Sequence, residues 1–122
     1  MYEIYWNICF NIKNESKVDL QVRKVSELLG CKINDYEVNK VTKIPNCYSS
    51  KFIIPCISTT KNEAIVETID LASKLGTGWY ILPIQTTGES LFFDGDRNNQ
   101  QSGFKLASII WVNFTLRNKG LN

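Results

Sequence analysis

Residues 2–12 read Tyr-Glu-Ile-Tyr-Trp-Asn-Ile-Cys-Phe-Asn-Ile, and every even-numbered position in this stretch is apolar. The odd-numbered positions include Glu3, Asn7 and Asn11, so apolar and polar side chains alternate. Successive side chains of a β-strand point to opposite faces of the sheet. The alternation therefore predicts a strand with one buried face, onto which the rest of the chain packs.

A helical pattern follows this strand. Ser16 and Asp19 have the spacing of a capping box, in which side chains accept hydrogen bonds from the first backbone N–H groups of a helix. Gly30 suits the left-handed conformation that ends a helix. We predict a first helix over residues 17–29. Its apolar stripe consists of Val18, Val22, Val25 and Leu29.

A second helix is predicted by the same signals. Thr60 and Glu63 repeat the capping box, and Gly76 supplies the stop. Apolar residues at helical spacing lie between them. They are Ile65, Ile69, Ala72 and Leu75.

Five further segments have the composition of strands. Residues 35–44 are expected to form an exposed strand, and residues 51–59 a more buried one. Pro55 lacks the N–H that a central strand needs, so it predicts a sheet edge or a bulge in the second of these. The remaining three segments are residues 79–87, 90–94 and 104–116, with a polar loop expected from Asp94 to Gly103.

The order of these elements predicts an α+β fold. It is β-α-β-β-α-β followed by two more strands, which is a ferredoxin-like core with a C-terminal β-hairpin extension. We expect an antiparallel sheet of about six strands with both helices on one face. Residues 1–122 form a single domain, because no linker or repeat interrupts them and 43% of the residues are hydrophobic.

Composition narrows the setting in which the protein works. The net charge of +2 gives no reason to expect nucleic acid or an anionic membrane as a partner. The N-terminus has no basic region followed by a continuous apolar run, and no stretch is long and apolar enough to span a bilayer. We expect a cytoplasmic protein. Its cysteines, Cys9, Cys31, Cys47 and Cys56, are accordingly expected to be reduced, with Cys9 and Cys56 partly buried in strands.

The common catalytic patterns are absent from the sequence. It contains no histidine, which removes the usual base of Ser and Cys nucleophiles and a frequent zinc ligand. Asp94 and Asp96 open a segment like a calcium loop, but Asn99 and Lys105 stand where that loop needs Gly and Glu. The seven glycines form no phosphate-binding cluster. We therefore expect no enzyme activity, no metal and no cofactor.

Protein binding is the interpretation that the remaining residues favour. Trp111 has the parity of the polar positions in its strand, so it either packs across strands against Tyr5 or serves as an exposed anchor for a partner. Trp79 and Tyr80 are further candidate anchors. RNA binding is less favoured, because residues 4–8 resemble the first-strand motif of RNA-recognition domains but residues 51–56 lack the second motif.

The chain as a whole resembles the small immunity proteins that bacteria encode beside polymorphic or contact-dependent growth-inhibition toxins. The likeness lies in its size, its α+β pattern, its Asn, Lys and Ile content, and the acids and aromatics of its C-terminal third. It implies a cytoplasmic inhibitor, monomeric or weakly dimeric, that binds a cognate toxin domain such as a nuclease. Glu89, Asp94 and Asp96 would then take the place of phosphate. The overall charge of +2 departs from the acidic character of many nuclease inhibitors. The alternative is a ferredoxin-like regulatory or small-molecule-binding domain.

Overall fold

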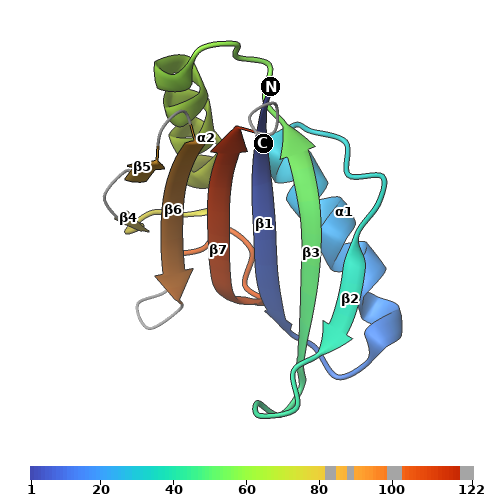
Figure 1. Cartoon of the computed structure of the whole chain (residues 1–122). Coiled ribbons are helices and arrows are strands. Elements are labelled where there is room, and N and C mark those ends of the chain that lie inside the picture. Colours follow the sequence, from blue (N-terminus) through green and yellow to red (C-terminus); the bar gives the residue numbers. More distant parts are fainter. Residues whose placement is uncertain (82–84, 88–89, 99–102, 119–122) are drawn as a thin grey trace.

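The protein is built from one antiparallel sheet and two α-helices, which confirms the α+β class (Figure 1). The computed structural model describes residues 1–81, 85–87, 90–98 and 103–118, and between residues 85 and 98 it describes the backbone. Glu89 lies outside the described residues.

The order of strands across the sheet is β2-β3-β1-β7-β6-β4, and β5 also pairs with β6. Five strands have four or more residues, one fewer than the six predicted, and two short pairings complete the sheet. The five are β1 (Tyr2–Asn11), β2 (Glu37–Lys40), β3 (Cys47–Pro55), β6 (Ser90–Asn98) and β7 (Ile109–Asn118). The predicted strand at residues 79–87 is divided into β4 (Tyr80–Ile81) and β5 (Gln85–Thr87).

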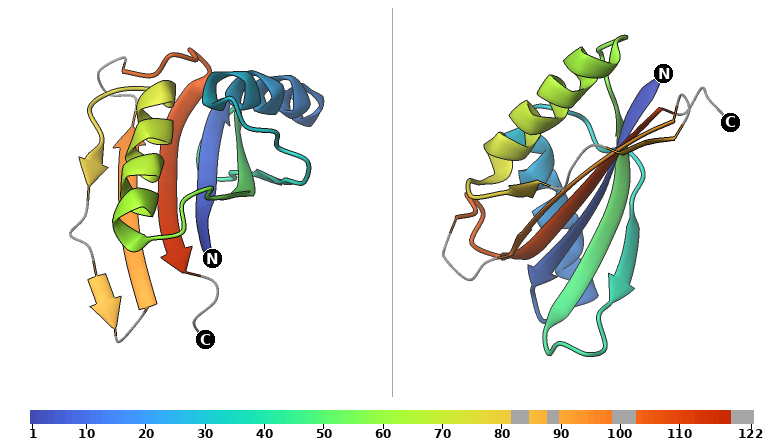
Figure 2. Two further views of the ribbon diagram at one scale, coloured as in Figure 1. Left: turned by 90° about the horizontal axis from the view of Figure 1, so that it is seen from above. Right: turned by 60° about the vertical axis from the view of Figure 1, so that its left-hand side comes forward.

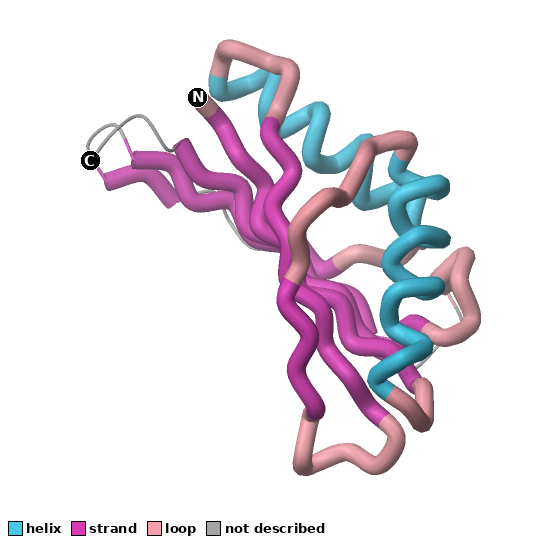
Figure 3. The backbone as a smooth tube through the Cα atoms, turned by 90° about the vertical axis from the view of Figure 1, so that its right-hand side faces the viewer, coloured by secondary structure: helices cyan, strands magenta, loops and turns pink. Residues whose placement is uncertain are grey.

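Both helices lie on one side of the sheet, as expected. They stand behind it in Figure 1 and to its right in Figure 3. The core fills the space between them and the sheet, and its largest fully buried side chains include Trp6, Phe10 and Phe114. Trp6 packs against Phe114 with ring centroids 5.6 Å apart.

The first helix, α1 (Val18–Leu29), ends as predicted but begins differently. Gly30 has a φ of 68° and donates its N–H to the carbonyl of Ser26 at 2.9 Å. At the other end a short 3-10 turn (Glu15–Lys17) precedes the helix, and Lys17 stands at the cap without a side-chain hydrogen bond. The prediction that Ser16 caps the helix is therefore wrong, because the 3-10 turn moves the cap position past it.

The second helix, α2 (Lys61–Leu75), begins and ends at the expected residues. Thr60 accepts a hydrogen bond from the N–H of Glu63, which is half of the predicted capping box. Beyond the helix, Gly76 pairs with Phe104 in an isolated bridge. A Cβ atom at position 76 would collide with the carbonyl oxygen of Gly103, so this close approach requires glycine.

Three strand boundaries differ from the prediction. β3 begins at Cys47 and ends at Pro55, four residues earlier than predicted at each end, because it pairs with β1 from Asn11 back to Glu3. β2 retains only residues 37–40. β7 begins at Ile109, later than the predicted start at residue 104, and a bulge opposite Cys9 and Phe10 accompanies the burial of Ile109.

Candidate functional site

The face of the sheet that the helices leave uncovered holds the candidate site. On β1 the even-numbered side chains from Ile4 to Phe10 are buried under the helices, while Tyr5, Asn7 and Cys9 on the opposite face are half-buried. The register aligns Tyr5 with Ile53 of β3 and Thr115 of β7. We call this surface the open face. It looks toward the viewer in Figure 1, and Figure 2 shows the sheet and its two helices from two further directions.

A groove of about 880 Å³ crosses the open face toward the β3 side of the sheet. Strands β1 and β7 line its floor, β3 lines one wall, and Lys32 with residues 34–37 lines the other wall. Its polar lining includes Glu3, Asn7, Lys51, Asn113 and Thr115. Small-molecule sites are mostly apolar and enclosed. This groove is open, and its lining combines polar and apolar surface, which favours a macromolecular occupant that makes both kinds of contact.

The groove exists because β2 accompanies β3 for only part of its length. The pairing of β2 with β3 ends at Glu37 and Lys51, whereas β3 continues to Pro55 and stays paired with β1 to that point. Residues 31–36, which we call the connecting segment, run from α1 to β2 outside β3 (Figure 1). Phe52–Pro55 therefore form a stretch of sheet edge, which we call the β3 edge, that faces the groove instead of a neighbouring strand.

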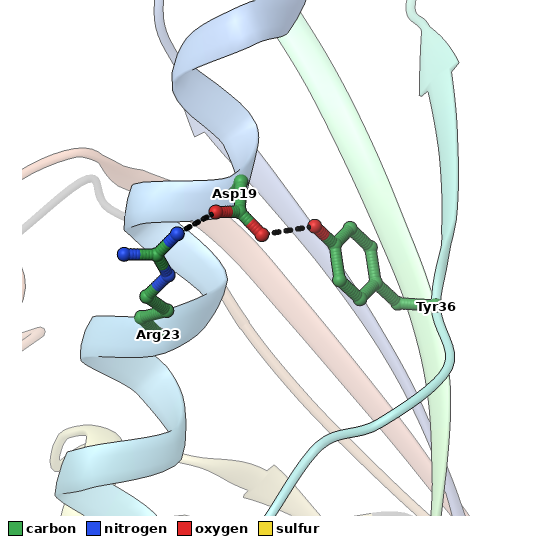
Figure 4. Close-up of polar contacts among 3 residues, drawn as sticks. All are labelled: Asp19, Arg23 and Tyr36. Carbon is green, nitrogen blue, oxygen red and sulfur yellow. Dashed lines mark hydrogen bonds and ion pairs between the residues drawn. The ribbon is translucent and has the colours of Figure 1, made fainter.

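A hydrogen-bonded cluster attaches the connecting segment to α1 (Figure 4). The hydroxyl of Tyr36 donates to Asp19 at 2.6 Å, and Arg23 donates to the same carboxylate at 2.5 Å. The Tyr36 hydroxyl, with a smaller contribution from Arg23, holds the pKa of Asp19 below its ordinary value. The same bond raises the pKa of Tyr36. The cluster thus directs Tyr36 toward the helix and away from the β3 edge.

The centre of the open face carries one charged and aromatic cluster. The guanidinium of Arg117 lies 5.0 Å from the centroid of the Tyr5 ring, within the range of a cation–π contact. The Tyr5 hydroxyl approaches Glu3 at 3.5 Å, and Glu3 itself is only 8% exposed. Glu3 and Arg117 are paired in the β1–β7 register. The Tyr5 side chain is therefore held in place by two charged residues, Arg117 at its ring and Glu3 at its hydroxyl. Many aromatic anchor residues at protein interfaces have charged neighbours of this kind.

One polar atom of a groove-lining residue stands out. The amide oxygen of Asn7 is buried and has no hydrogen-bond partner among the described residues. A buried acceptor or donor without a partner costs about 1–3 kcal/mol of stability. A ligand that supplies a donor to Asn7 would recover part of that cost.

The acidic residues predicted from sequence are placed differently from expectation. Asp94 and Asp96 lie within β6, where they pair with Thr115 and Asn113 of β7, so the prediction of a loop from Asp94 onward is wrong up to Asn98. Pairing with β7 overrides the low strand propensity of this segment. Their backbone positions continue the rows that contain Tyr5 and Asn7.

The predicted aromatic anchors fall into two groups. Trp79 donates its indole N–H to the carbonyls of Ala72 and Gly76 at 3.1 and 3.0 Å, and its ring packs 5.4 Å from that of Phe114. It thereby supports the end of α2. Tyr80 is 69% exposed in β4, and the half-buried Trp111 pairs with Cys9 in the row beyond Asn7. Tyr5 and Trp111 thus share the open face, as their parity predicted.

Cys9 and Cys56 have little nucleophilic character. Burial, followed by the neighbouring Cys47 thiol, raises the pKa of Cys9 to about 11. Burial and nearby Glu67 raise the pKa of Cys56 to about 12. These thiols are neutral at physiological pH. In the described part of the chain, no group of three or more His, Cys, Asp or Glu side chains is placed to hold a metal ion.

Comparison with known proteins assigns no family. No family model, no curated protein and no solved structure matches this chain. Neither helix, within the described residues, is long and apolar enough to cross a membrane.

Sequence reasoning did not predict the groove. The one signal that pointed to it was Pro55, which marks the sheet edge that forms one wall.

Proposed function

We propose that this chain is a protein-binding domain and that its open face, with the groove, is the surface that binds the partner. The observation that carries the proposal is the combination found there: Tyr5, an aromatic residue in contact with charged residues, lines an open groove with a mixed polar and apolar lining. Protein interfaces use buried aromatic and Arg anchors surrounded by a polar rim. Enzyme and metal functions have no comparable support among the described residues.

The biological role that we propose is that of an immunity protein, which neutralises a cognate bacterial toxin domain by covering its active site or substrate surface. Support comes from the resemblance of the whole sequence to such proteins and from the acids of the C-terminal third. Asp94 and Asp96 occupy β6 positions next to Thr115 and Asn113, which line the groove. A nuclease toxin would present basic residues to such acids, and charge-assisted hydrogen bonds would hold them. In this proposal the protein acts in the bacterial cytoplasm.

A ferredoxin-like regulatory domain is the second candidate. Its support is the order β2-β3-β1-β7, with α1 between β1 and β2 and α2 after β3, which is the order of a ferredoxin-like sheet with β7 as its fourth strand. In this proposal β4, β5 and β6 are inserted before that last strand and not appended after it. A regulatory domain of this kind would bind a metabolite, and small-molecule sites are enclosed, whereas the open groove favours a protein.

The test is co-expression with the product of the neighbouring reading frame. If that product is a toxin, co-expression restores growth, and the two proteins elute together as a complex in size-exclusion chromatography. Tyr5→Ala is expected to weaken the complex by about 2 kcal/mol, as anchor residues do. Val66→Ala is the matched control, because Val66 is exposed on α2, on the helix side of the sheet. Normal growth inhibition and no complex in the presence of the chain would contradict the proposal.

The acidic residues are tested by a triple variant, with Glu89, Asp94 and Asp96 each replaced by alanine. If the partner is basic, each replacement is expected to cost about 2 kcal/mol of binding. Unchanged affinity would assign the interface to the Tyr5 and Trp111 region alone. A large fall in the melting temperature would instead show that these acids serve the fold.

A further inference from the structure

The β3 edge presents unused backbone groups in a defined direction. The N–H of Cys56 donates to the carbonyl of Tyr2 at 2.9 Å, just beyond the Glu3–Pro55 pair. In an antiparallel pair, hydrogen-bonded and non-hydrogen-bonded positions alternate. The backbone groups of Phe52 and Ile54 therefore point toward β1, and those of Ile53 and Pro55 point away from β1, into the groove.

The edge thus offers one donor and two acceptors. Ile53 contributes an N–H and a carbonyl, and Pro55 contributes a carbonyl only, because proline has no N–H. Closer to the start of β3, the equivalent groups of Lys51 and Ser49 face β2, which pairs with β3 from Lys51 back to Tyr48. The side chain of Ile53 is 47% exposed beside them.

We propose that the β3 edge binds an extended segment of the partner protein, which adds to the sheet as a short strand in line with β2. This inference rests on the proposed protein-binding function and specifies how the partner is held. Strand addition uses main-chain hydrogen bonds for affinity and side-chain pockets for specificity. The groove offers main-chain groups for hydrogen bonds and space for side chains. Phe52, Ile53 and Pro55 line one of its walls, and the connecting segment lines the other wall.

The chemistry of the groove defines the segment that fits. Its charged lining consists of three carboxylates, on Glu3, Asp35 and Glu37, and two ammonium groups, on Lys32 and Lys51. The backbone edge has more acceptors than donors, and the buried amide oxygen of Asn7 is a further acceptor without a described partner. A basic, donor-rich segment complements both features. The partner segment is therefore an extended one that carries Lys or Arg.

A second copy of this chain is the less suitable occupant. Edge-to-edge pairing of two sheets needs an edge that another sheet can approach along its length. Here the connecting segment lies outside β3 and lines the same groove, with Tyr36 attached to α1 through Asp19. A single extended chain can enter between these walls more easily than the edge of a folded sheet.

The experiment selects random decapeptides displayed on phage against the whole chain and measures the affinity of the synthetic winners by calorimetry. We expect Lys- or Arg-containing peptides. Ile53→Pro removes the only N–H on the edge without breaking a bond to β1, so it is expected to weaken binding about tenfold or more. Ile53→Val retains the N–H and is the matched control, with affinity close to that of the wild type. Thermal melting of both variants establishes that they fold.

A second measurement uses only the wild-type chain, so its result does not depend on whether the Ile53→Pro variant folds. The same peptides are made with N-methyl groups at alternate residues and measured against the wild-type chain. Binding by strand addition is lost in one N-methylation register and retained in the other, because only alternate N–H groups face the β3 edge. Failure to select any peptide, or binding that neither Ile53→Pro nor N-methylation reduces, would overturn the inference.

These outcomes separate the inference from the proposed function. A toxin complex that forms normally with Ile53→Pro would leave protein binding intact and refute strand addition. Peptides that bind at the β3 edge, together with the absence of any complex with the neighbouring gene product, would support the edge as a docking site and refute the immunity role.

Discussion

Successive residues of β1 point to opposite faces of the sheet, and the two faces have different roles. Ile4, Trp6 and Ile8 point toward the helices and are almost fully buried. Tyr5 and Asn7, between them, face the groove and retain partial exposure and polar atoms. Alternate residues of one strand can therefore contribute separately to the stability of the fold and to partner binding. Changes on the helix side should affect folding, and changes on the open face should affect partner binding.

The largest expected effect lies on the helix side. Phe114 is fully buried and packs against both Trp6 and Trp79. Phe114→Ala leaves a cavity between these rings and should destabilise the protein by about 3–5 kcal/mol. Chemical denaturation measures the change. A loss below about 1 kcal/mol would mean that the core is not centred on these aromatic residues.

Neighbouring isoleucines on β3 provide the most closely matched comparison. Ile54 is 4% exposed on the helix side, and Ile54→Ala should cost about 2–5 kcal/mol. Ile53 is 47% exposed on the open face, and Ile53→Ala should cost about 0.5 kcal/mol. Both variants make the same chemical change, so denaturation curves compare them directly. Equal losses would contradict the assignment of the two faces.

Glu67 gives a pH-dependent effect of intermediate size. It accepts hydrogen bonds from the N–H groups of Ile57 and Ser58 and from the Ser58 hydroxyl, which joins the end of β3 to α2. Partial burial raises the pKa of this carboxyl. The hydrogen bonds together lower the pKa by more than burial raises it, so the net pKa lies below the ordinary 4.5. As the pH falls, the Glu67 carboxyl is therefore protonated in the unfolded chain before it is protonated in the folded chain. The stabilisation is present above about pH 4.5 and is lost as the pH falls through the lower folded pKa.

The measurement compares wild type with Glu67→Gln in urea at several pH values. A difference of about 1 kcal/mol is expected near pH 7, because hydrogen bonds to a charged but partly exposed group are weakened by solvent. The difference should shrink as the pH falls below about 4.5 and through the lower folded pKa, since the wild-type carboxyl then becomes protonated. A difference that does not change with pH would show that the charge of Glu67 has no part in it.

The smallest effect concerns the attachment of the connecting segment. Tyr36→Phe removes the hydroxyl that donates to Asp19, so the pKa of Asp19 should rise toward its ordinary value while Arg23 still lowers it in part. Titration of the Asp19 carboxyl by NMR measures this shift, and global stability should change little. An unchanged Asp19 pKa would show that the Tyr36 bond does not hold the segment away from the β3 edge.

The sequence predicted the elements with strong local patterns and missed the features set by distant contacts. The alternation of residues 2–12, the stripe of the first helix and the cap and stop signals of the second identified β1, α1 and α2 because those signals lie within each element. The stripe predicted for α2 is only half right, because Ala72 and Leu75 are buried while Ile69 is 46% exposed. Just before the first residue of β2, Tyr36 bonds to Asp19, 17 residues earlier, and no local pattern encodes that contact. Likewise, β6 extends through Asp94 and Asp96 because β7 pairs with it. Of the candidate site, the sequence predicted the parity of Tyr5 and Trp111 and, through Pro55, a sheet edge, but not the groove.

Hydrogen exchange of the β3 amides tests most directly the claim that this strand has an open edge within a stable sheet. In the uncomplexed protein, NMR should find the amides of Phe52 and Ile54 protected, because they donate to β1, while the amide of Ile53 exchanges orders of magnitude faster. Lys51, which pairs with Glu37 of β2, should be protected more than Ile53. If the Ile53 amide is protected as strongly as its two neighbours, the edge is covered and the proposed binding surface is not there.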